Sequence, residues 1–511
     1  MTKTQKRLML DKYLKSILTS RVYDVARETP LEIARGLSRR CRNKVWLKRE
    51  DTQDVFSFKI RGAYNKMARI PADKLKLGVV AASAGNHAQG VAMAAQHLKC
   101  PATIFMPVTA PAIKVNAVRN WGAKVKLVGD IFDDTNVEAI RFCEEHGQTF
   151  IPPYDDAEVI AGQGTIGIEL LNQHSGNINA IFIPVGGGGL VAGIAAYIKA
   201  LRPDIHIIGV EPEDAASMTA ALERKRRIKL SEVGQFADGV AVRQAGETTY
   251  KMCRELVDEM ITVSTDEICA AIKDIFEDTR SIMEAAGALS VAGLKKCVSE
   301  KELSDQELIA ITTGANMNFD RLRHVSERAE IGERREAILC VTIPERPGSF
   351  RKFCRLIGKR NVTEFNYRYA DDCDAQIYVG LQVQNETDVE SLITKLTDNG
   401  YATHDFTDNE LAKLHIRHMV GGRAPQVANE MLFRFRFPER PGALSSFLDK
   451  LGDNWNISLF HYRNHGADYG RVLCGIQVER KDRGRLAGYL DELGFSWSDE
   501  SDNVAYRLFL G

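Results

Sequence analysis

The stretch Ala180-Ile-Phe-Ile-Pro-Val-Gly-Gly-Gly-Gly-Leu190 runs from an apolar segment straight into four glycines. The apolar part is typical of a buried strand, and Leu190 opens a helical pattern. Four consecutive glycines cost backbone entropy, but without side chains several of their N–H groups can converge on a phosphate. A flexible loop is the alternative, and the tight strand and helix flanks argue against it. The stretch therefore predicts a strand–loop–helix unit that binds a phosphate group.

The same alternation extends on both sides of this stretch, from about Val45 to Met317. Further strands are predicted over 78–83, 102–107, 124–128 and 206–210, with helices ending at 98 and covering 133–146. Such alternation indicates an α/β fold with a largely parallel sheet. The sheet-forming part is long for one core, so we expect a bilobed domain.

The composition excludes several classes of function. The 511 residues carry 68 Lys and Arg against 68 Asp and Glu, so bulk charge does not favour nucleic acid or an anionic membrane as a partner. No apolar run reaches the roughly 18 to 20 residues that a membrane-spanning helix needs. The ten cysteines are scattered singly without a Cys-x-x-Cys pair, which favours a reducing compartment. We therefore expect a cytoplasmic enzyme, although a plastid form without its transit peptide would look the same.

The C-terminal part of the chain contains a repeat. Residues 344–350, Pro-Glu-Arg-Pro-Gly-Ser-Phe, recur as Pro-Glu-Arg-Pro-Gly-Ala-Leu at 438–444, and 361–368 matches 456–463. Each copy is predicted as strand, turn, amphipathic helix, strand, turn, strand and a second helix, which is a βαββαβ plan. The charged stretch before the repeat is predicted to be a solvated connecting helix or linker. The predicted domains are 1–323, a linker over 324–336, and two modules over 337–420 and 421–511.

Three further motifs lie in the α/β part. Lys59, between Phe58 and Ile60 at a predicted helix start, could become a nucleophile if burial lowers its pKa, although a surface lysine is the simpler interpretation. The segment 83–90, Ser-Ala-Gly-Asn-His-Ala-Gln-Gly, follows a strand and opens a helix, so its N–H groups could hold a carboxylate or form an ordinary cap. Thr313 ends a strand at the edge where α/β sheets bind ligands. Neither a P-loop lysine nor a dinucleotide fingerprint is present, which leaves a phosphate-bearing cofactor.

Taken in order, Ser57-Phe-Lys59, Ser83-Ala-Gly-Asn-His87, the four glycines and Thr313-Gly-Ala-Asn316, joined to two tandem modules, resemble the biosynthetic threonine dehydratases. This family belongs to the fold-type II, tryptophan-synthase-β-like enzymes that use pyridoxal phosphate. The resemblance covers essentially the whole chain. It implies a bilobed catalytic domain with mostly parallel sheets, followed by two ACT-like, ferredoxin-like regulatory modules.

The resemblance also implies where pyridoxal phosphate binds. Lys59 would form a Schiff base with it, the glycine loop would hold its phosphate, and Asn86 would bind its ring 3-oxygen. A neutral Thr313 hydroxyl beside the pyridine nitrogen would not keep that nitrogen protonated, which favours elimination over transamination. The implied cofactor-binding residues are Phe58, Lys59, Asn86, Gly186, Gly187, Gly188, Gly189, Leu190, Gly239 and Thr313.

The implied reaction is the dehydration and deamination of L-threonine to 2-oxobutanoate and ammonia, the first committed step of isoleucine biosynthesis, with L-serine as a secondary substrate. Catalytic roles are implied for Lys59, Ser83 and Glu284. The substrate carboxylate would be held by Ser83, Ala84, Gly85, Asn86 and His87. A lyase or racemase acting mainly on serine is the alternative, but Ala84 stands where serine racemases carry a second serine. A silent amino-acid sensor is a further alternative, against which the lysine and the intact glycine loop argue.

The regulatory ligands implied by the resemblance are isoleucine as inhibitor and valine as its opponent. Candidate effector residues are Tyr367, Leu444, Leu448 and Tyr462, and an ordinary core role is the alternative for each tyrosine. The family implies a homotetramer. Some relatives hold a divalent ion with a Glu and an Asp six residues later, but here Glu211 is followed by Ser217, so no metal is expected.

Overall fold

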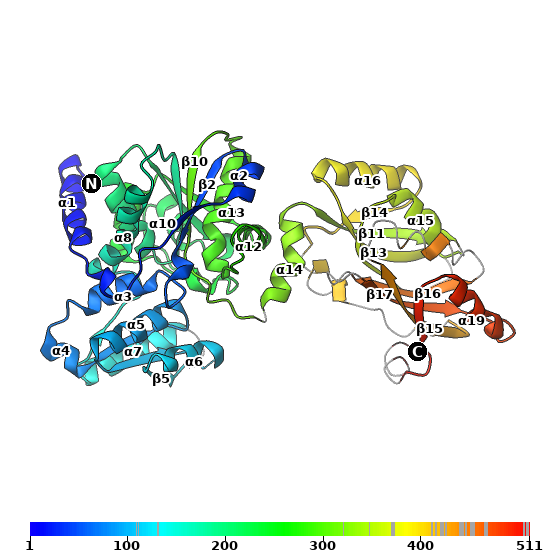
Figure 1. Cartoon of the computed structure of the whole chain (residues 1–511), viewed down its shortest axis with the longest axis horizontal. Coiled ribbons are helices and arrows are strands. Elements are labelled where there is room, and N and C mark those ends of the chain that lie inside the picture. The colour runs from blue at the N-terminus through cyan, green and yellow to red at the C-terminus, as the bar shows by residue number, and fades with distance from the viewer. Residues whose placement is uncertain are drawn as a thin grey trace. The chain divides into compact units, whose positions relative to one another are not determined.

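A computed structural model describes the chain except residues 109, 111, 130–131, 320, 347, 369–373, 410–411, 414–415, 419–423, 425–426, 439–443, 445–446, 450–454, 464–468, 504–505, 507–509 and 511. It divides into two compact units, Met1–Gly332 and Glu333–Gly511. Figure 1 labels the elements of both units.

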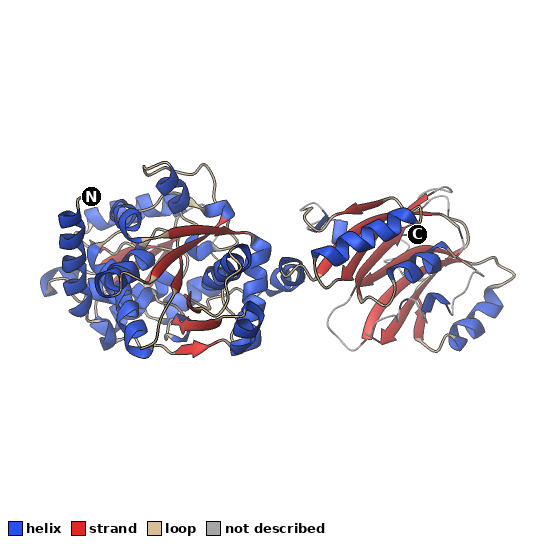
Figure 2. Cartoon of the chain, turned by 90° about the horizontal axis from the view of Figure 1, so that it is seen from above, coloured by secondary structure: helices blue, strands red, loops and turns tan. Residues whose placement is uncertain are grey.

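A six-stranded sheet forms the centre of the first unit. Its strands, in spatial order, are β1 (Leu31–Ile33), β2 (Lys44–Arg49), β10 (Glu307–Thr312), β7 (Ala180–Pro184), β8 (His206–Pro212) and β9 (Glu259–Val263). Every neighbouring pair is parallel except β1 with β2. Along β7, Ala180 and Phe182 enter one core while Ile181 and Ile183 enter another. The apolar runs are continuous because helices cover both faces of this sheet (Figure 2).

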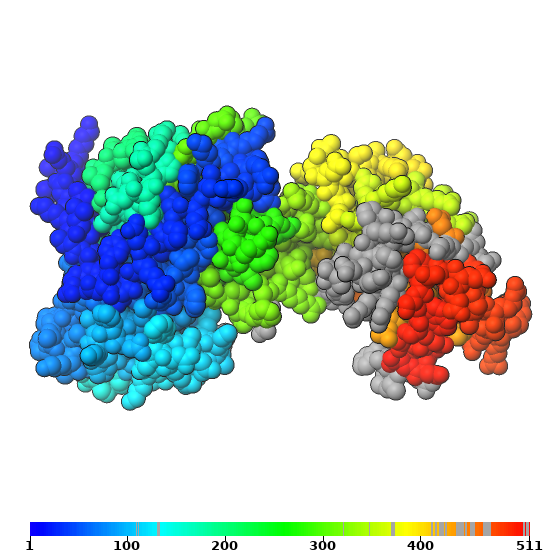
Figure 3. Space-filling view, viewed as in Figure 1, coloured from blue at the N-terminus to red at the C-terminus, as the bar shows by residue number. Residues whose placement is uncertain are grey.

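A second, fully parallel sheet forms the smaller lobe of the same unit. Its order is β5 (Lys124–Leu127), β4 (Ala102–Met106), β3 (Val79–Ala82) and β6 (Thr149–Phe150). Figure 3 shows the residues of this lobe, in light blue and cyan, gathered at one end of the unit. The two sheets confirm the bilobed, mostly parallel α/β domain that the sequence predicts.

Helices surround both sheets, and the predicted helix ends agree with the observed ones to within a few residues. None of the described helices is long and apolar enough to cross a membrane. The α-helices of this unit are α1 (Lys3–Leu18), α2 (Arg35–Cys41), α3 (Lys59–Met67), α4 (Ala72–Leu77), α5 (Asn86–Leu98), α6 (Ala112–Asn120), α7 (Phe132–Glu145), α8 (Ala157–Gln173), α9 (Gly189–Leu201), α10 (Ser217–Glu223), α11 (Glu247–Leu256), α12 (Thr265–Thr279), α13 (Ala285–Glu300) and α14 (Arg321–Gly332).

The charged segment 324–336 is mostly helical, in agreement with the predicted connecting helix, but this helix is packed on one face and not fully solvated. Most of it belongs to α14, which packs against α12. Val325, Ala329 and Ile331 are buried, and the Arg328 guanidinium pairs with Asp266 of α12. Apolar side chains at helical spacing form a packed face here, although the charged residues outnumber them. The division between the two units therefore falls after Gly332.

The second unit is built on one eight-stranded antiparallel sheet. In spatial order its strands are β14 (Thr403–Asp405), β11 (Glu336–Pro344), β13 (Asp374–Gln382), β12 (Val362–Arg368), β16 (Asn456–Arg463), β17 (Tyr469–Gln477), β15 (Glu430–Pro438) and β18 (Ser496–Asp499). The helices α15 (Ser349–Ile357), α16 (Glu386–Asp398) and α19 (Arg483–Glu492) contribute apolar side chains to a single core with it. Figure 2 shows these helices beside the strands.

The first repeat follows the predicted βαββαβ order completely, from β11 to β14. The second repeat shows the same four strands and α19, while much of the segment between β15 and β16 lies outside the described residues. The two repeats share one sheet because β12 pairs with β16. In that pair Asn366 lies opposite His461, its counterpart in the repeat, so the two modules are related by a local two-fold axis at this point.

Candidate active site

Lys59 is the first residue of α3, a helix that packs against both α5 and α8. Its amine donates a hydrogen bond to the carbonyl oxygen of Pro153 at 3.0 Å and lies 5.2 Å from the centre of the Phe58 ring. The side chain is half-buried, and burial around the amine lowers its pKa to about 8, an effect that the charge of Glu284 opposes. Lys59 therefore has the lowered pKa that a lysine nucleophile or base requires.

The segment 83–87 connects β3 to α5 and lies against the start of α3. Gly85 donates its N–H to the Ser83 hydroxyl at 3.2 Å, and a Cβ on Gly85 would meet no atom within 4 Å. His87 places Nε2 2.8 Å from the carbonyl oxygen of Ile151, and burial lowers its pKa to about 3, with the nearby Lys59 charge as a second cause. The segment therefore presents a helix N-terminus, neutral apart from its dipole, beside open space.

The glycine loop joins β7 to α9 and is closely packed against its neighbours. Gly188 has φ +92°, which favours glycine, and a Cβ on Gly187 would lie 2.2 Å from the Tyr154 ring. A Cβ on Gly186 would lie 2.9 Å from the Cα of Val240. Any side chain here would displace a packed neighbour, so the flexible-loop interpretation does not fit.

Asn86, Gly239 and Glu284 meet although they lie far apart in sequence. The Asn86 amide donates to Oε1 of Glu284, the residue that precedes α13. A Cβ on Gly239 would lie 3.8 Å from the same oxygen and 3.9 Å from Nδ2 of Asn86. Burial, with Asp238 as a second cause, raises the pKa of Glu284 to about 7. This carboxyl group can therefore exchange a proton near neutral pH.

Thr313 follows β10, and its hydroxyl donates to the carbonyl oxygen of Ala286 at 3.2 Å. The Thr313 carbonyl oxygen accepts the N–H of Phe58 at 3.3 Å, which ties the end of β10 to the segment before Lys59. The Ser57 hydroxyl beside it is buried and has no partner among the described residues. The polar groups of these two segments thus meet at the carboxyl edge of the sheet.

Several residues of the site were missed in the sequence. Pro153 accepts the Lys59 amine, and the ring of the next residue, Tyr154, covers the glycine loop. Lys114 of α6 forms an ion pair with Asp238, beside Gly239. No local motif marks Pro153, Tyr154 or Lys114, and only the short distance of Tyr154 from a strand end could have drawn attention to it.

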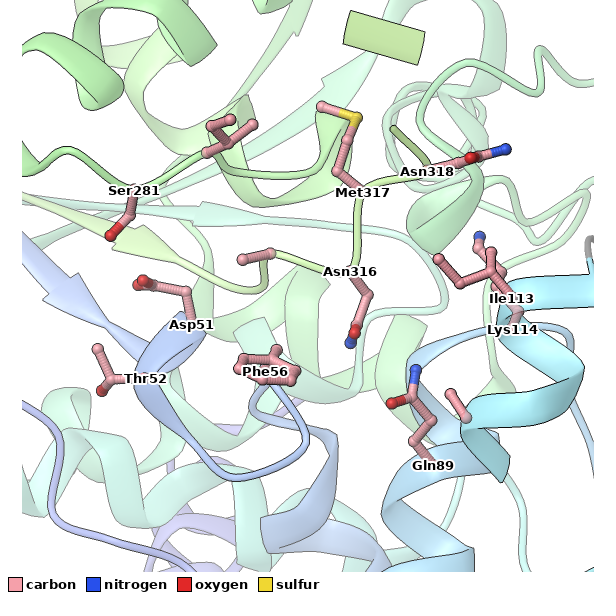
Figure 4. Close-up of a pocket in the computed structure, with 13 residues that line it drawn as sticks. Asp51, Thr52, Phe56, Gln89, Ile113, Lys114, Ser281, Asn316, Met317 and Asn318 are labelled. Carbon is pink, nitrogen blue, oxygen red and sulfur yellow. The ribbon is translucent and has the colours of Figure 1, made fainter. Parts of the chain in front are cut away.

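A cavity of about 500 Å³ opens next to the site (Figure 4). Gln89 and Lys114 line it from α5 and α6, and Asn316 projects toward it from the segment after β10. The cavity lining is Asp51, Thr52, Phe56, Gln89, Ile113, Lys114, Ala117, Ser281, Ile282, Ala315, Asn316, Met317 and Asn318. Asn316 also bonds to Asn86, so the cavity reaches the predicted site residues.

Glu211, which aligns with the metal-binding Glu of some relatives, bonds to the start of a helix in this chain. Its carboxylate accepts N–H groups of Met218 and Thr219 at 2.9 and 2.8 Å and the Thr219 hydroxyl at 2.7 Å, at the start of α10. The described part of the chain contains no group of three or more potential metal-ligating side chains.

The four candidate effector residues lie in the second unit. Tyr367 of β12 is opposite Phe460, and Tyr462 of β16 is opposite Phe365, so the tyrosines flank the local two-fold axis. The Tyr367 hydroxyl donates to Glu345 of the first Glu-Arg-Pro-Gly turn. The two tyrosines, Leu444 and Leu448 are all at most 7% exposed and belong to one apolar core. The four residues therefore lie in the same core, and this position is compatible with an effector role and with a core role.

Comparisons with known proteins agree with this geometry. Residues 22–314 match the family model of pyridoxal-phosphate-dependent enzymes, and residues 327–416 and 421–510 match the C-terminal regulatory domain of threonine dehydratase. The chain thus belongs to the pyridoxal-phosphate-dependent enzymes of this fold.

Within that class it is a member of the biosynthetic threonine dehydratases. It is 56% identical over 501 residues to the biosynthetic L-threonine dehydratase of Burkholderia multivorans, covering 98% of this chain and 99% of the relative. The Escherichia coli enzyme of the same name is 49% identical, with 98% and 97% covered. Among solved structures, processed threonine deaminase isoform 2 of Solanum lycopersicum is 51% identical with a TM-score of 0.62, over 63% of this chain and 93% of that one. Maize serine racemase is 30% identical with a TM-score of 0.57, over 61% and 96%.

The residues present fit pyridoxal phosphate. An amine with a lowered pKa lies at Lys59, and the glycine loop ends at the N-terminus of α9, where backbone N–H groups favour a phosphate. The bond from Lys59 to Pro153, followed by the Tyr154 ring over Gly187, links the amine to this loop. Asn86 and the Thr313 hydroxyl supply polar groups for the ring.

Proposed function

We propose that the protein converts L-threonine to 2-oxobutanoate and ammonia, with L-serine as a slower substrate. The proposal rests on one observation above all: Lys59, with its lowered pKa, is linked through Pro153 and Tyr154 to a glycine loop closed to side chains. The full-length similarity to enzymes called biosynthetic L-threonine dehydratase supports the choice of substrate. The reaction would supply the first committed step of isoleucine biosynthesis.

Each residue of the site has a separate task in this proposal. When bound, pyridoxal phosphate supplies an electron sink that weakens the bonds at the substrate Cα. The Lys59 amine takes the Cα proton, and the N–H groups of 83–87 hold the substrate carboxylate. Glu284, with its pKa of about 7, lies where a proton can be given or taken, and the Ser83 hydroxyl is near the carboxylate site. The Thr313 hydroxyl, which donates to the Ala286 carbonyl oxygen, would supply a neutral polar group beside the ring.

The test is keto-acid formation by the purified protein with added cofactor. L-threonine should give 2-oxobutanoate faster than L-serine gives pyruvate, and we expect little D-serine because Ala84 provides no second acid. One methyl group supports only about 10- to 200-fold discrimination, so serine should react measurably. Faster turnover of serine, or D-serine as the main product, would instead support the serine lyase or racemase.

We infer that isoleucine inhibits the enzyme and valine opposes it, through ligands bound near Tyr367, Leu444, Leu448 and Tyr462. The matched regulatory-domain model and the position of both tyrosines at the joined strands support this. Tyr462→Leu should weaken isoleucine inhibition about 5- to 150-fold while turnover without effector stays near wild type. Tyr401→Leu, at another buried tyrosine of the same unit, is the matched control. Equal weakening in both variants would mean that Tyr462 acts only in the core.

We also propose a cytoplasmic homotetramer without a metal requirement. The scattered cysteines of the sequence and the bacterial relatives support the compartment, although plant relatives are called chloroplastic and a yeast relative mitochondrial. Light scattering should give four times the chain mass. Turnover should persist after treatment with a chelator of divalent ions.

A further inference from the structure

Asn316 lies in the segment after β10, and its side chain connects two fixed points. Its Nδ2 donates to the carbonyl oxygen of Val55 at 2.8 Å and to Oδ1 of Asn86 at 2.7 Å. The Asn86 amide in turn donates to Oε1 of Glu284. These contacts form one chain of hydrogen bonds, Val55–Asn316–Asn86–Glu284, from the backbone into the site.

The direction of this chain is set at its first member. A carbonyl oxygen can only accept, so the amide nitrogen of Asn316, not its oxygen, must face Val55. The second hydrogen of the same nitrogen then points to Asn86, whose side-chain oxygen must accept it. The Asn86 nitrogen is left to face Glu284 and the site. One backbone carbonyl thereby determines the orientation of an amide two side chains away.

The carbonyl of Val55 is itself held in place. Val55 is fully buried, and the Phe56 carbonyl oxygen accepts the N–H of Ala315 at 3.0 Å. Ser57 forms a β-bridge with Gly314. Phe56 has φ +54°, a conformation that side chains other than glycine rarely adopt, and these cross-links maintain it. The segment that carries Val55 and the segment that carries Asn316 therefore move as one.

We propose that Asn316 is a positioning residue that holds the Asn86 amide with its nitrogen toward the cofactor ring oxygen. This rests on the proposed function, in which Asn86 faces that oxygen. A donated hydrogen bond stabilises negative charge on the oxygen, whereas a reversed amide would present a carbonyl lone pair to it. Asn316 thus controls the electrostatics of the ring without touching it.

Asn316→Asp tests this directly because a carboxylate has acceptors only. It cannot donate to Val55 or to Asn86, so the Asn86 amide turns its nitrogen toward Asp and its oxygen toward the site. We expect the pH midpoint of the bound cofactor's visible absorbance to rise. The cofactor dissociation constant should increase, and kcat should decrease, by about tenfold or more. Asn316→Ala removes the lock without reversing it and should give smaller changes of the same sign.

Asn318→Ala is the matched control, since Asn318 is the same residue type, in the same segment, and lines the same cavity. It should leave the absorbance midpoint and the cofactor affinity as in wild type. Thermal unfolding of the cofactor-free variants checks that all three fold. If Asn316→Asp folds poorly, Asn316→Ala carries the test.

An unchanged midpoint and affinity in the folded Asn316 variants would overturn the proposal, and so would equal shifts in Asn318→Ala. Failure of the proposed function is recognised separately. Hydride reduction of the wild-type protein with cofactor should attach the cofactor permanently to Lys59. If Lys59 carries no cofactor after reduction, the cofactor assignment is wrong, whatever the Asn316 variants do.

Discussion

Two clusters of ionisable side chains include residues of the first turn of α3, Lys59 in one cluster and Arg61 in the other. Their charges are compensated in different ways. The closed cluster consists of Lys48, Glu50, Arg61 and Glu169. The open cluster consists of Lys59, His87 and Glu284. Comparing them shows how the surroundings of Lys48 and Lys59 differ, since Lys48 is paired with Glu169 and Lys59 donates to a backbone carbonyl.

In the closed cluster every charge has a partner of opposite sign. Arg61 donates to both Glu50 oxygens at 2.8 and 2.7 Å and to Glu169 at 2.5 Å, and Lys48 donates to Glu169 at 2.6 Å. All four residues are at most 2% exposed. Burial opposes the charge of Arg61, but the two glutamates raise its pKa well above the ordinary value. Burial also lowers the pKa of Lys48, an effect that the charge of Glu169 opposes, so the closed cluster offsets its burial through paired charges of opposite sign.

In the open cluster the hydrogen-bond partners of the side chains are neutral: two backbone carbonyl oxygens and the amide of Asn86. Burial lowers the pKa of Lys59 to about 8 and of His87 to about 3, and raises that of Glu284 to about 7. Each shift favours the neutral form of the group. Oppositely charged partners therefore offset burial in one cluster, whereas in the other burial brings the pKa values of Lys59 and Glu284 close to neutral pH and keeps His87 uncharged.

The largest effect is expected from removing the amine of the open cluster. Lys59→Ala should lower threonine turnover by at least about 10³- to 10⁴-fold, because it removes both the attachment point of the cofactor and the base. Keto-acid formation at saturating cofactor measures this. Lys48→Ala does not share the chemistry, so its cofactor would still attach to Lys59 in whatever fraction folds. Turnover retained in Lys59→Ala would assign the base elsewhere.

Breaking the closed cluster should cost stability before chemistry. Arg61→Met leaves Glu50 and Glu169 buried with incomplete partners, and we expect the free energy of unfolding to fall by about 3 to 5 kcal/mol. Denaturant unfolding of the cofactor-free protein measures this change. Lys66→Met is the control on the same helix, because the Lys66–Asp156 pair is partly exposed and should contribute about 1 kcal/mol or less. Equal losses in both variants would mean that the closed cluster has no special weight.

The two clusters also differ in how far the sequence predicts them. Lys59, Asn86 and the glycine loop lie in short contiguous motifs at strand and helix ends, so the resemblance to a family could single them out. The members of the closed cluster come from β2, α3, α8 and the turn after β2, and nothing local connects them. The pair of Asn86 with Glu284 is likewise formed only when α5 meets α13. Contacts across the sheet edges need the fold, as does the burial that shifts each pKa.

The same limit applies to the larger architecture. The repeat predicted two βαββαβ modules, but side-chain alternation cannot tell which strand edges pair, so the joint sheet through β12 and β16 was not predicted. The many charges of α14 concealed an apolar face of three residues. The roles of the individual site residues remain predictions, because proximity does not assign chemistry.

A smaller effect is expected from removing the carboxylate of the open cluster. The charge of Glu284 raises the pKa of Lys59, so Glu284→Gln should lower it below about 8. Covalent attachment of cofactor to the cofactor-free protein needs the neutral amine, and its rate should rise with pH up to the Lys59 pKa and then level off. The midpoint should therefore move to lower pH in Glu284→Gln. Glu213→Gln, an exposed acid, should leave it in place, and an upward shift in Glu284→Gln would contradict this electrostatic account.

The smallest effect is expected at His87, whose lowered pKa keeps the ring neutral near neutral pH. Its Nε2 must carry a hydrogen because it faces the Ile151 carbonyl oxygen, and a pKa of about 3 keeps the ring uncharged above about pH 4. His87→Gln retains an amide donor, so kcat should fall by roughly 10-fold at most and the shape of its pH profile should be unchanged. His97→Gln, later on α5, controls for general effects on the helix. A change in kcat near pH 6 that is seen in the wild type and is lost only in His87→Gln would show that the ring titrates there. His87 would then be charged at lower pH, which would contradict the neutral state described above.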